Sequence, residues 1–235
     1  MIRLPRTADY FLTVPAFEVT ALQRYLDLMD RNLAALVEQD PEPEWDGRPE
    51  TGGSAMVAQL YHEVVSTMLP QVFRSSFVLV LYATFEAAVT ETADVLRQQH
   101  GRPTELPANS SFLKAASRYF HDEFSIELLP ADSRDKIHVL KRVRDALVHA
   151  NGRKGAMKAS TWDKLASDRD RGAAFSLEDG YIRLEQGFLV DMLLAVRVSL
   201  RSLITAARDS LEEAARGPNA AHRPKLDLGG IGRSG

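Results

Sequence analysis

The chain has 235 residues, a net charge of −3 and no cysteine, and 45% of its residues are hydrophobic. This length and composition allow a full buried core, and the lack of cysteine excludes disulfides, thiolate metal sites and cysteine nucleophiles. The lack of cysteine also makes the cytoplasm the expected compartment, and the N-terminal residues lack the apolar core of a signal peptide. The longest apolar run, Phe77 to Val89, is too short and too polar to suggest a membrane span.

In the N-terminal half, hydrophobic residues recur every three or four positions, which is typical of amphipathic helices. The pattern predicts helices from Phe17 to Glu38 and from about Ala55 to Met68. The segment between them, about residues 40–54, is rich in proline and glycine and predicts a loop. Pro70 predicts a break or kink before the next helix, Val72 to Gln99. That helix is apolar nearly all round in its first half, which places it at the centre of a bundle.

Two shorter helices follow in the middle of the chain. A cap at Asn109 or Ser110 predicts a helix that ends at Phe124. A cap at Asp132 or Ser133 predicts another helix, which ends at Asn151–Gly152 because both residues tolerate the left-handed conformation.

The period of the pattern changes near the C-terminus. Alternating residues around Asp179-Gly180 predict a β-hairpin over about residues 174–186, followed by a long helix from Phe188 to about Ala215. Residues 217–235 hold turn residues and few apolar ones, so they predict a disordered tail. The expected fold is therefore all-α: one helical domain over residues 1–216, with a small hairpin before the C-terminal helix.

Basic residues are concentrated between Arg134 and Lys158. This segment contains eight lysines and arginines but only two aspartates. Its local charge is therefore about +6, which leaves about −9 for the rest of the chain. A basic zone on an acidic protein can attract phosphate, but a solvated helix face and a basic loop would have the same composition.

The stretch RVRDALVHANG, Arg142 to Gly152, contains an arginine in an unusual position. On a helical wheel, Arg144 falls inside the apolar arc, close to Ile137 and Val148. A buried arginine needs a carboxylate, carbonyl groups or a ligand, so Arg144 predicts either a structural ion pair or a functional site. His149, in the last turn, either caps carbonyl groups or acts as a general acid or base.

The sequence RDALVHANG resembles the signature of HEPN domains, in which an arginine, a polar residue, several apolar residues and a histidine follow one another. Arg144, Asp145 and His149 match this pattern, and Asn151-Gly152 also looks like many members. The apolar segment from Arg74 to Val89 and the hairpin before the last helix are similar to stand-alone, phage-defence-associated members. The resemblance covers roughly residues 57–208.

This resemblance implies a homodimer in which the arginines and histidines of both chains line one cleft. In nuclease members, that cleft cuts RNA without a metal. His149 would then act as general acid or base, and Arg144 would bind the scissile phosphate. Two departures matter. Arg142 competes for the phosphate role, and Asn151 stands where members paired with a nucleotidyltransferase antitoxin have a tyrosine.

Other residues supplement this motif. Glu86 lies in the most apolar helix and needs a partner, for which Arg144 and Arg74 are the candidates. The loop after His149 carries cations that could hold RNA phosphates: Arg153, Lys154 and Lys158. The histidine spacing predicts no metal site, and no phosphate-binding loop or cofactor motif is found.

Two functional hypotheses follow. The first is a metal-independent endoribonuclease that acts as a homodimer, as a toxin or an abortive-infection effector against phage, with an antitoxin or another defence protein as a possible partner. The second is a catalytically silent HEPN-type dimer that binds RNA, a nucleotide or a partner protein.

Overall fold

The computed structural model describes residues 14–39, 53–107 and 111–216, which form an all-α fold with one small hairpin, as predicted. The α-helices are α2 (Val14–Gln39), α3 (Gly53–Glu63), α4 (Leu69–His100), α5 (Phe112–Phe124), α6 (Ala131–Ala150), α7 (Ala159–Asp170) and α8 (Gln186–Arg216). The hairpin consists of β1 (Phe175–Glu178) and β2 (Tyr181–Leu184). The predicted tail and most of the predicted loop at 40–54 lie outside the described residues, as do Asn109 and Ser110.

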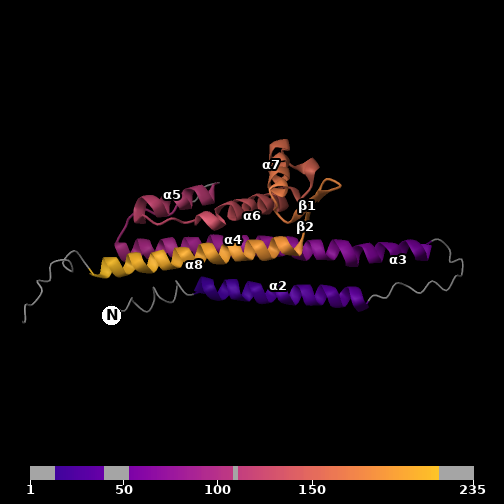
Figure 1. Cartoon of the computed structure of the whole chain (residues 1–235), viewed down its shortest axis with the longest axis horizontal. Helices are drawn as coiled ribbons and strands as arrows, with labels where there is room; N and C mark the ends of the chain where they lie inside the picture. The colour runs from indigo at the N-terminus through magenta and orange to yellow at the C-terminus, as the bar shows by residue number, and fades with distance from the viewer. Residues whose placement is uncertain (1–13, 40–52, 108–110, 217–235) are drawn as a thin grey trace, which may run out of the picture.

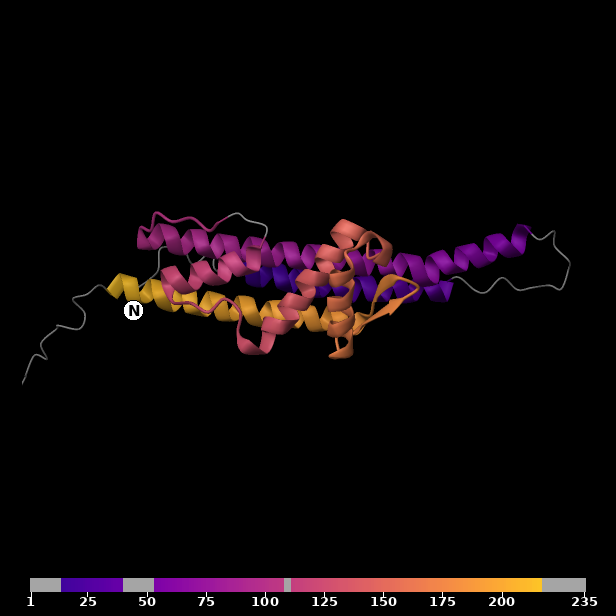
Figure 2. The same cartoon turned by 90° about the horizontal axis from the view of Figure 1, so that it is seen from above.

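Helices α4 and α8 lie side by side and form the long axis of the molecule (Figures 1 and 2). Helix α2 runs along one side of this pair, whereas α5 and α6 lie on the other side. The largest side chains with almost no exposed surface include Phe77, Tyr82 and Phe85 of α4 and Phe188 of α8. The predicted central position of α4 is therefore confirmed, and its burial against α8 contributes to the hydrophobic stabilisation of the fold.

Pro70 does not end the helix, so of the predicted break or kink the break is wrong. Instead, α3 continues into α4 through a π-helical segment, Val64–Met68, and Pro70 is buried in the first turn of α4. Proline has no N–H to bond the carbonyl four residues earlier, and its ring would crowd that carbonyl. The wider π turn accommodates both effects without ending the helix.

The continuous helix Gln59–His100 is long and apolar enough, by length and composition, to cross a membrane. The longest apolar run considered in the sequence, residues 77–89, is only part of this helix. The C-terminal part of the helix is core, but several large apolar side chains of its N-terminal part are exposed: Leu60, Tyr61, Val64, Met68 and Val72. A core helix of a soluble protein passes the same test, so this finding does not identify a span.

The hairpin forms where the alternating pattern predicts it. Phe175 pairs with Leu184 and Glu178 with Tyr181, and Asp179 and Gly180 make the turn with φ of 50° and 78°. The Leu184 carbonyl accepts hydrogen bonds from the side chains of Gln71 and Arg74, both at 3.0 Å. The hairpin is therefore fixed to helix α4.

Three details differ from the sequence-based predictions. Helix α6 begins after Pro130, and Ser133 is buried and hydrogen-bonds Ser199 at 2.8 Å instead of capping the helix. Val148, which falls in the apolar arc of the wheel, is exposed in the single chain. Helix α7 was not predicted, because its sequence ASTWDKLASDRD holds few apolar residues and no clear period.

Candidate functional site

Helix α6 positions the candidate residues and ends where the sequence predicts. Asn151 adopts the left-handed conformation, with φ of 47° and ψ of 36°. The amide of Asn151 donates to the Leu147 carbonyl at 3.0 Å, and that of Gly152 donates to Ala146 at 3.1 Å. This left-handed cap satisfies the final carbonyl groups of the helix. It also sets the direction in which the basic loop leaves α6.

Arg144 lies against helix α4 and is held by three neighbours. Its guanidinium donates to Asp145 at 2.9 Å and lies 3.7 Å from the Glu86 carboxylate. The guanidinium carbon also lies 5.2 Å from the centre of the Tyr82 ring, a cation–π contact. Of the two partners considered for Glu86, Arg144 is therefore the one in contact. The pairing explains why an arginine is tolerated in the apolar arc.

Partial burial perturbs the carboxylate in this group. Desolvation raises the pKa of Glu86, whereas the charge of Arg144 and the Tyr82 hydroxyl act in the opposite direction. Desolvation also raises the pKa of Tyr82, with the charge of Glu86 as the next cause. Tyr82 thus remains a neutral phenol, and the positive charge of Arg144 is shared between two carboxylates.

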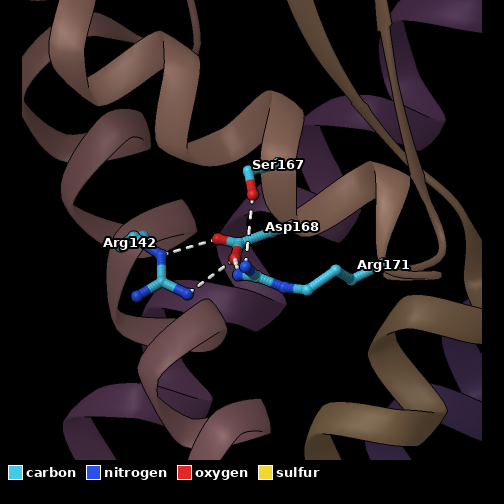
Figure 3. A network of polar contacts seen from close by, with 4 residues as sticks. All are labelled: Arg142, Ser167, Asp168 and Arg171. Atoms are coloured by element: carbon cyan, nitrogen blue, oxygen red, sulfur yellow. Dashed lines mark hydrogen bonds and ion pairs between the residues drawn. The ribbon is translucent and has the colours of Figure 1, made fainter.

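Arg142 points to a different neighbour, Asp168 of helix α7 (Figure 3). Its Nε and Nη2 atoms donate to the two carboxylate oxygens of Asp168 at 2.6 and 2.8 Å. Asp168 is only 1% exposed and also pairs with Arg171, which hydrogen-bonds Ser167 at 3.2 Å. Such a bidentate pair fixes α7 to α6. The pair also occupies two donor atoms of Arg142, the arginine that competes with Arg144 for the phosphate role.

The remaining charges of the basic zone divide into two groups. Toward the start of α6, three residues are paired with carboxylates: Arg134 with Glu127, Lys136 with Asp191, and Lys141 with Asp145. The three cations of the following loop have no carboxylate partner among the described residues: Arg153, Lys154 and Lys158. Most of the positive charge counted from the sequence is thus neutralised locally, and the loop retains its charge.

His149 is exposed in the last turn of α6. Within residues 14–39, 53–107 and 111–216, no side chain hydrogen-bonds or ion-pairs with its imidazole. His149 is five positions after Arg144, so the two residues are separated by about 140° around the helix axis. One chain therefore presents the two motif residues in different directions.

The loop after α6 is joined to the hairpin. The amide of Lys154 donates to the Gly180 carbonyl at 2.7 Å, and that of Ile182 donates to Gly152 at 3.0 Å. An isolated bridge also pairs Arg153 with Tyr181. These contacts bring Tyr181 of the hairpin and Trp162 of α7 next to the predicted cations. Sequence analysis missed both aromatic residues, although each lies within a segment of mixed polar and aromatic composition.

No family model, curated protein or solved structure matches the chain. In the part of the chain that the structure describes, no group of three or more histidine, cysteine, aspartate or glutamate side chains is arranged to hold a metal ion. The candidate site is therefore defined by the geometry of its own residues.

Proposed function

We propose that the protein is a metal-independent endoribonuclease that acts as a homodimer, with Arg144 and His149 of both chains in one cleft. The observation that carries the proposal is the end of helix α6. It combines an arginine held in place, an exposed histidine and a loop with three unneutralised cations. This set supplies a phosphate ligand, a proton donor or acceptor, and contacts to flanking phosphates.

The chemistry needs two histidine roles. One imidazole removes the proton from a 2′-hydroxyl, and the other protonates the leaving 5′-oxygen. A dimer provides both imidazoles, and the Arg144 of either chain stabilises the charge on the phosphate. Asp145 and Glu86 orient Arg144 in this proposal, and Asn151 sets the end of the helix.

Exposed apolar surface supports association of two chains. On helix α4, an uncharged stripe runs beside Glu86, and its members are Val72, Ser76, Val80, Ala83 and Ala87. Val148 of α6 is also exposed, one turn after Arg144. We propose that a second copy, rather than a membrane, covers this surface and that the protein is cytoplasmic. A role as a toxin or abortive-infection effector would follow from RNA cleavage.

One observation favours the catalytically silent dimer as a second candidate. The guanidinium of Arg144 already contacts two carboxylates and the Tyr82 ring. A phosphate would have to compete with these partners. If a phosphate cannot displace these partners, the protein binds RNA, a nucleotide or a partner protein without cutting RNA.

Cleavage of RNA by the purified protein distinguishes the two functions. We expect wild-type protein to cleave in the presence of a chelator and to leave a 2′,3′-cyclic phosphate. His149→Ala should abolish cleavage, with a loss of about 0.5 kcal/mol or less in stability, because the side chain is exposed. The control is His121→Ala, which removes another exposed histidine in the last turn of α5 and should cleave normally. Absence of cleavage in every variant would favour the silent dimer.

A further inference from the structure

A pocket of about 830 Å³ lies between the basic loop, the start of α7 and the turn of the hairpin. The residues lining it that matter for recognition are Arg153, Lys154, Trp162, Asp163, Asp179 and Tyr181. The pocket begins four residues after His149 in the chain. It thus combines two aromatic rings, two cations and two carboxylates in the segment that directly follows the proposed catalytic helix.

The two rings each lie next to cations. The guanidinium carbons of Arg153 and Arg183 are 5.7 and 5.8 Å from the centre of the Tyr181 ring, and Lys154 Nζ is 5.6 Å from that of Trp162. Tyr181 is exposed and Trp162 half-buried, so part of each ring is accessible. Aromatic faces that accept bases, with cations that follow the phosphates, are the usual means of binding single-stranded nucleic acid.

The pocket is held in shape without a ligand. The hydrogen bonds from Lys154 to Gly180 and from Ile182 to Gly152 attach the loop to the hairpin. Leu165 of α7 and Ile182 of β2 are both buried and anchor the two aromatic walls to the core. A preformed pocket loses little conformational entropy on binding, so more of the contact energy contributes to affinity.

The acidic residues indicate what kind of ligand fits. Asp163 and Asp179 would repel a ligand that carries only negative charge. A nucleobase, in contrast, has amino groups that donate hydrogen bonds to carboxylates. Rings, cations and carboxylates together therefore fit a nucleotide within a strand better than a free phosphate or an acidic peptide.

We propose that this pocket binds a nucleobase of single-stranded RNA by stacking on Tyr181 and Trp162, with Arg153 and Lys154 on the adjoining phosphates. The inference rests on the proposed function, because it assigns the RNA contact next to the cleavage site. It adds that the substrate is single-stranded there, since a base within a duplex does not offer its face.

Trp162 provides a direct signal for the test. The chain has two tryptophans, so Trp45→Phe in the full-length protein leaves Trp162 as the remaining one. The probe is an eight-nucleotide RNA with 2′-O-methyl groups, which cannot be cut by attack of the 2′-oxygen. We expect saturable quenching of the Trp162 fluorescence. Absence of quenching and of binding would overturn the inference.

Substitutions then locate the contact. Tyr181→Leu should weaken binding of the probe by roughly 10-fold, within the range for one stacked base, whereas Tyr181→Phe should retain it. Tyr61→Leu removes another exposed tyrosine, on α3, and should leave binding unchanged. Arg153→Gln should lower the slope of log K against log salt by about 0.7, the value for one phosphate of a single strand. Circular dichroism confirms that each variant is folded, and a folded Tyr181→Leu variant with unchanged affinity would overturn the inference.

Two further arms separate the possible explanations. An abasic oligonucleotide with the same number of phosphates should bind at least 10-fold more weakly than the probe, by the same stacking estimate. If this oligonucleotide or a poly-glutamate peptide binds as tightly as the probe, the pocket is only an anion site and the inference is overturned. If the wild type binds the probe in the pocket but cuts no RNA, the nuclease proposal fails while the pocket assignment stands. If it cuts RNA, and neither Tyr181→Leu nor the double variant Trp162→Leu/Tyr181→Leu alters binding, the nuclease proposal stands and the pocket assignment fails.

Discussion

At the scale of single residues, the two arginines of the motif stretch differ in what their loss exposes. Arg142 is bound through two nitrogens to Asp168, which is 1% exposed. Arg144 instead contacts Glu86 and Asp145, whose side chains are both partly exposed to solvent. The sequence could place both on one helix but could not choose between them. The choice depends on α7, a helix whose pattern gives no sign of its position.

Arg142→Ala should therefore act mainly on stability. It leaves the buried carboxylate of Asp168 with Arg171 as its cationic neighbour, and we expect a loss of about 3 kcal/mol in the free energy of unfolding. Arg171→Ala is the matched control. Its side chain is 67% exposed, so the loss should stay below about 1 kcal/mol. Urea denaturation measures both, and an equal or larger loss for Arg171→Ala would contradict the assignment.

Glu86 makes stability depend on pH through its raised pKa. A carboxyl group whose pKa is higher in the folded state contributes stability below its unfolded pKa and loses that contribution as the pH rises through the folded pKa. Glu86→Gln removes this dependence. The stability of wild type relative to Glu86→Gln should thus fall as the pH increases through the carboxyl range into the region just above it. Denaturant curves at several pH values test the sign, and a rising difference would refute it.

At the scale of helices and strands, patterns of hydrophobic residues predicted elements well wherever one face is strongly apolar. The hairpin and the C-terminal end of α6 follow from Asp179-Gly180 and Asn151-Gly152, which suit positive φ. Pro70 left a break and a kink both open, and the structure keeps the helix continuous through a local π-helical segment. The pairing of Glu86 with Arg144 was one of two predicted options, because each residue places a charge among the apolar residues of its helix.

The cap of α6 offers a test of the role of Asn151. Asn151→Ala should lower the free energy of unfolding by about 1 kcal/mol, because alanine adopts the left-handed conformation at a cost. Asn151→Gly should be neutral or slightly stabilising. If Asn151 only ends the helix, the glycine variant keeps full RNA cleavage. A folded glycine variant without cleavage would assign the side chain a direct part in the reaction.

At the scale of the whole molecule, two substitutions test which face forms the proposed dimer. Val80 of α4 and Leu194 of α8 are 48% and 51% exposed, so substitutions at the two positions can be compared directly. Val80 belongs to the uncharged stripe that runs beside Glu86. We expect Val80→Glu to convert the dimer to a monomer and Leu194→Glu to leave it intact, since a charge is costly only in the buried interface. Light scattering at micromolar concentration reports the mass. A monomeric wild type would refute the dimer, and the reverse result would place the interface on α8.

The length of the α3–α4 helix has a hydrodynamic consequence. At 1.5 Å per residue, Gly53–His100 spans roughly 70 Å. A compact chain of 235 residues has a radius of gyration of only about 17 Å and hence a diameter of roughly 45 Å. The molecule is correspondingly elongated (Figures 1 and 2). It should sediment slowly for its mass and elute early from a sizing column, so that even a single chain would migrate like a larger protein.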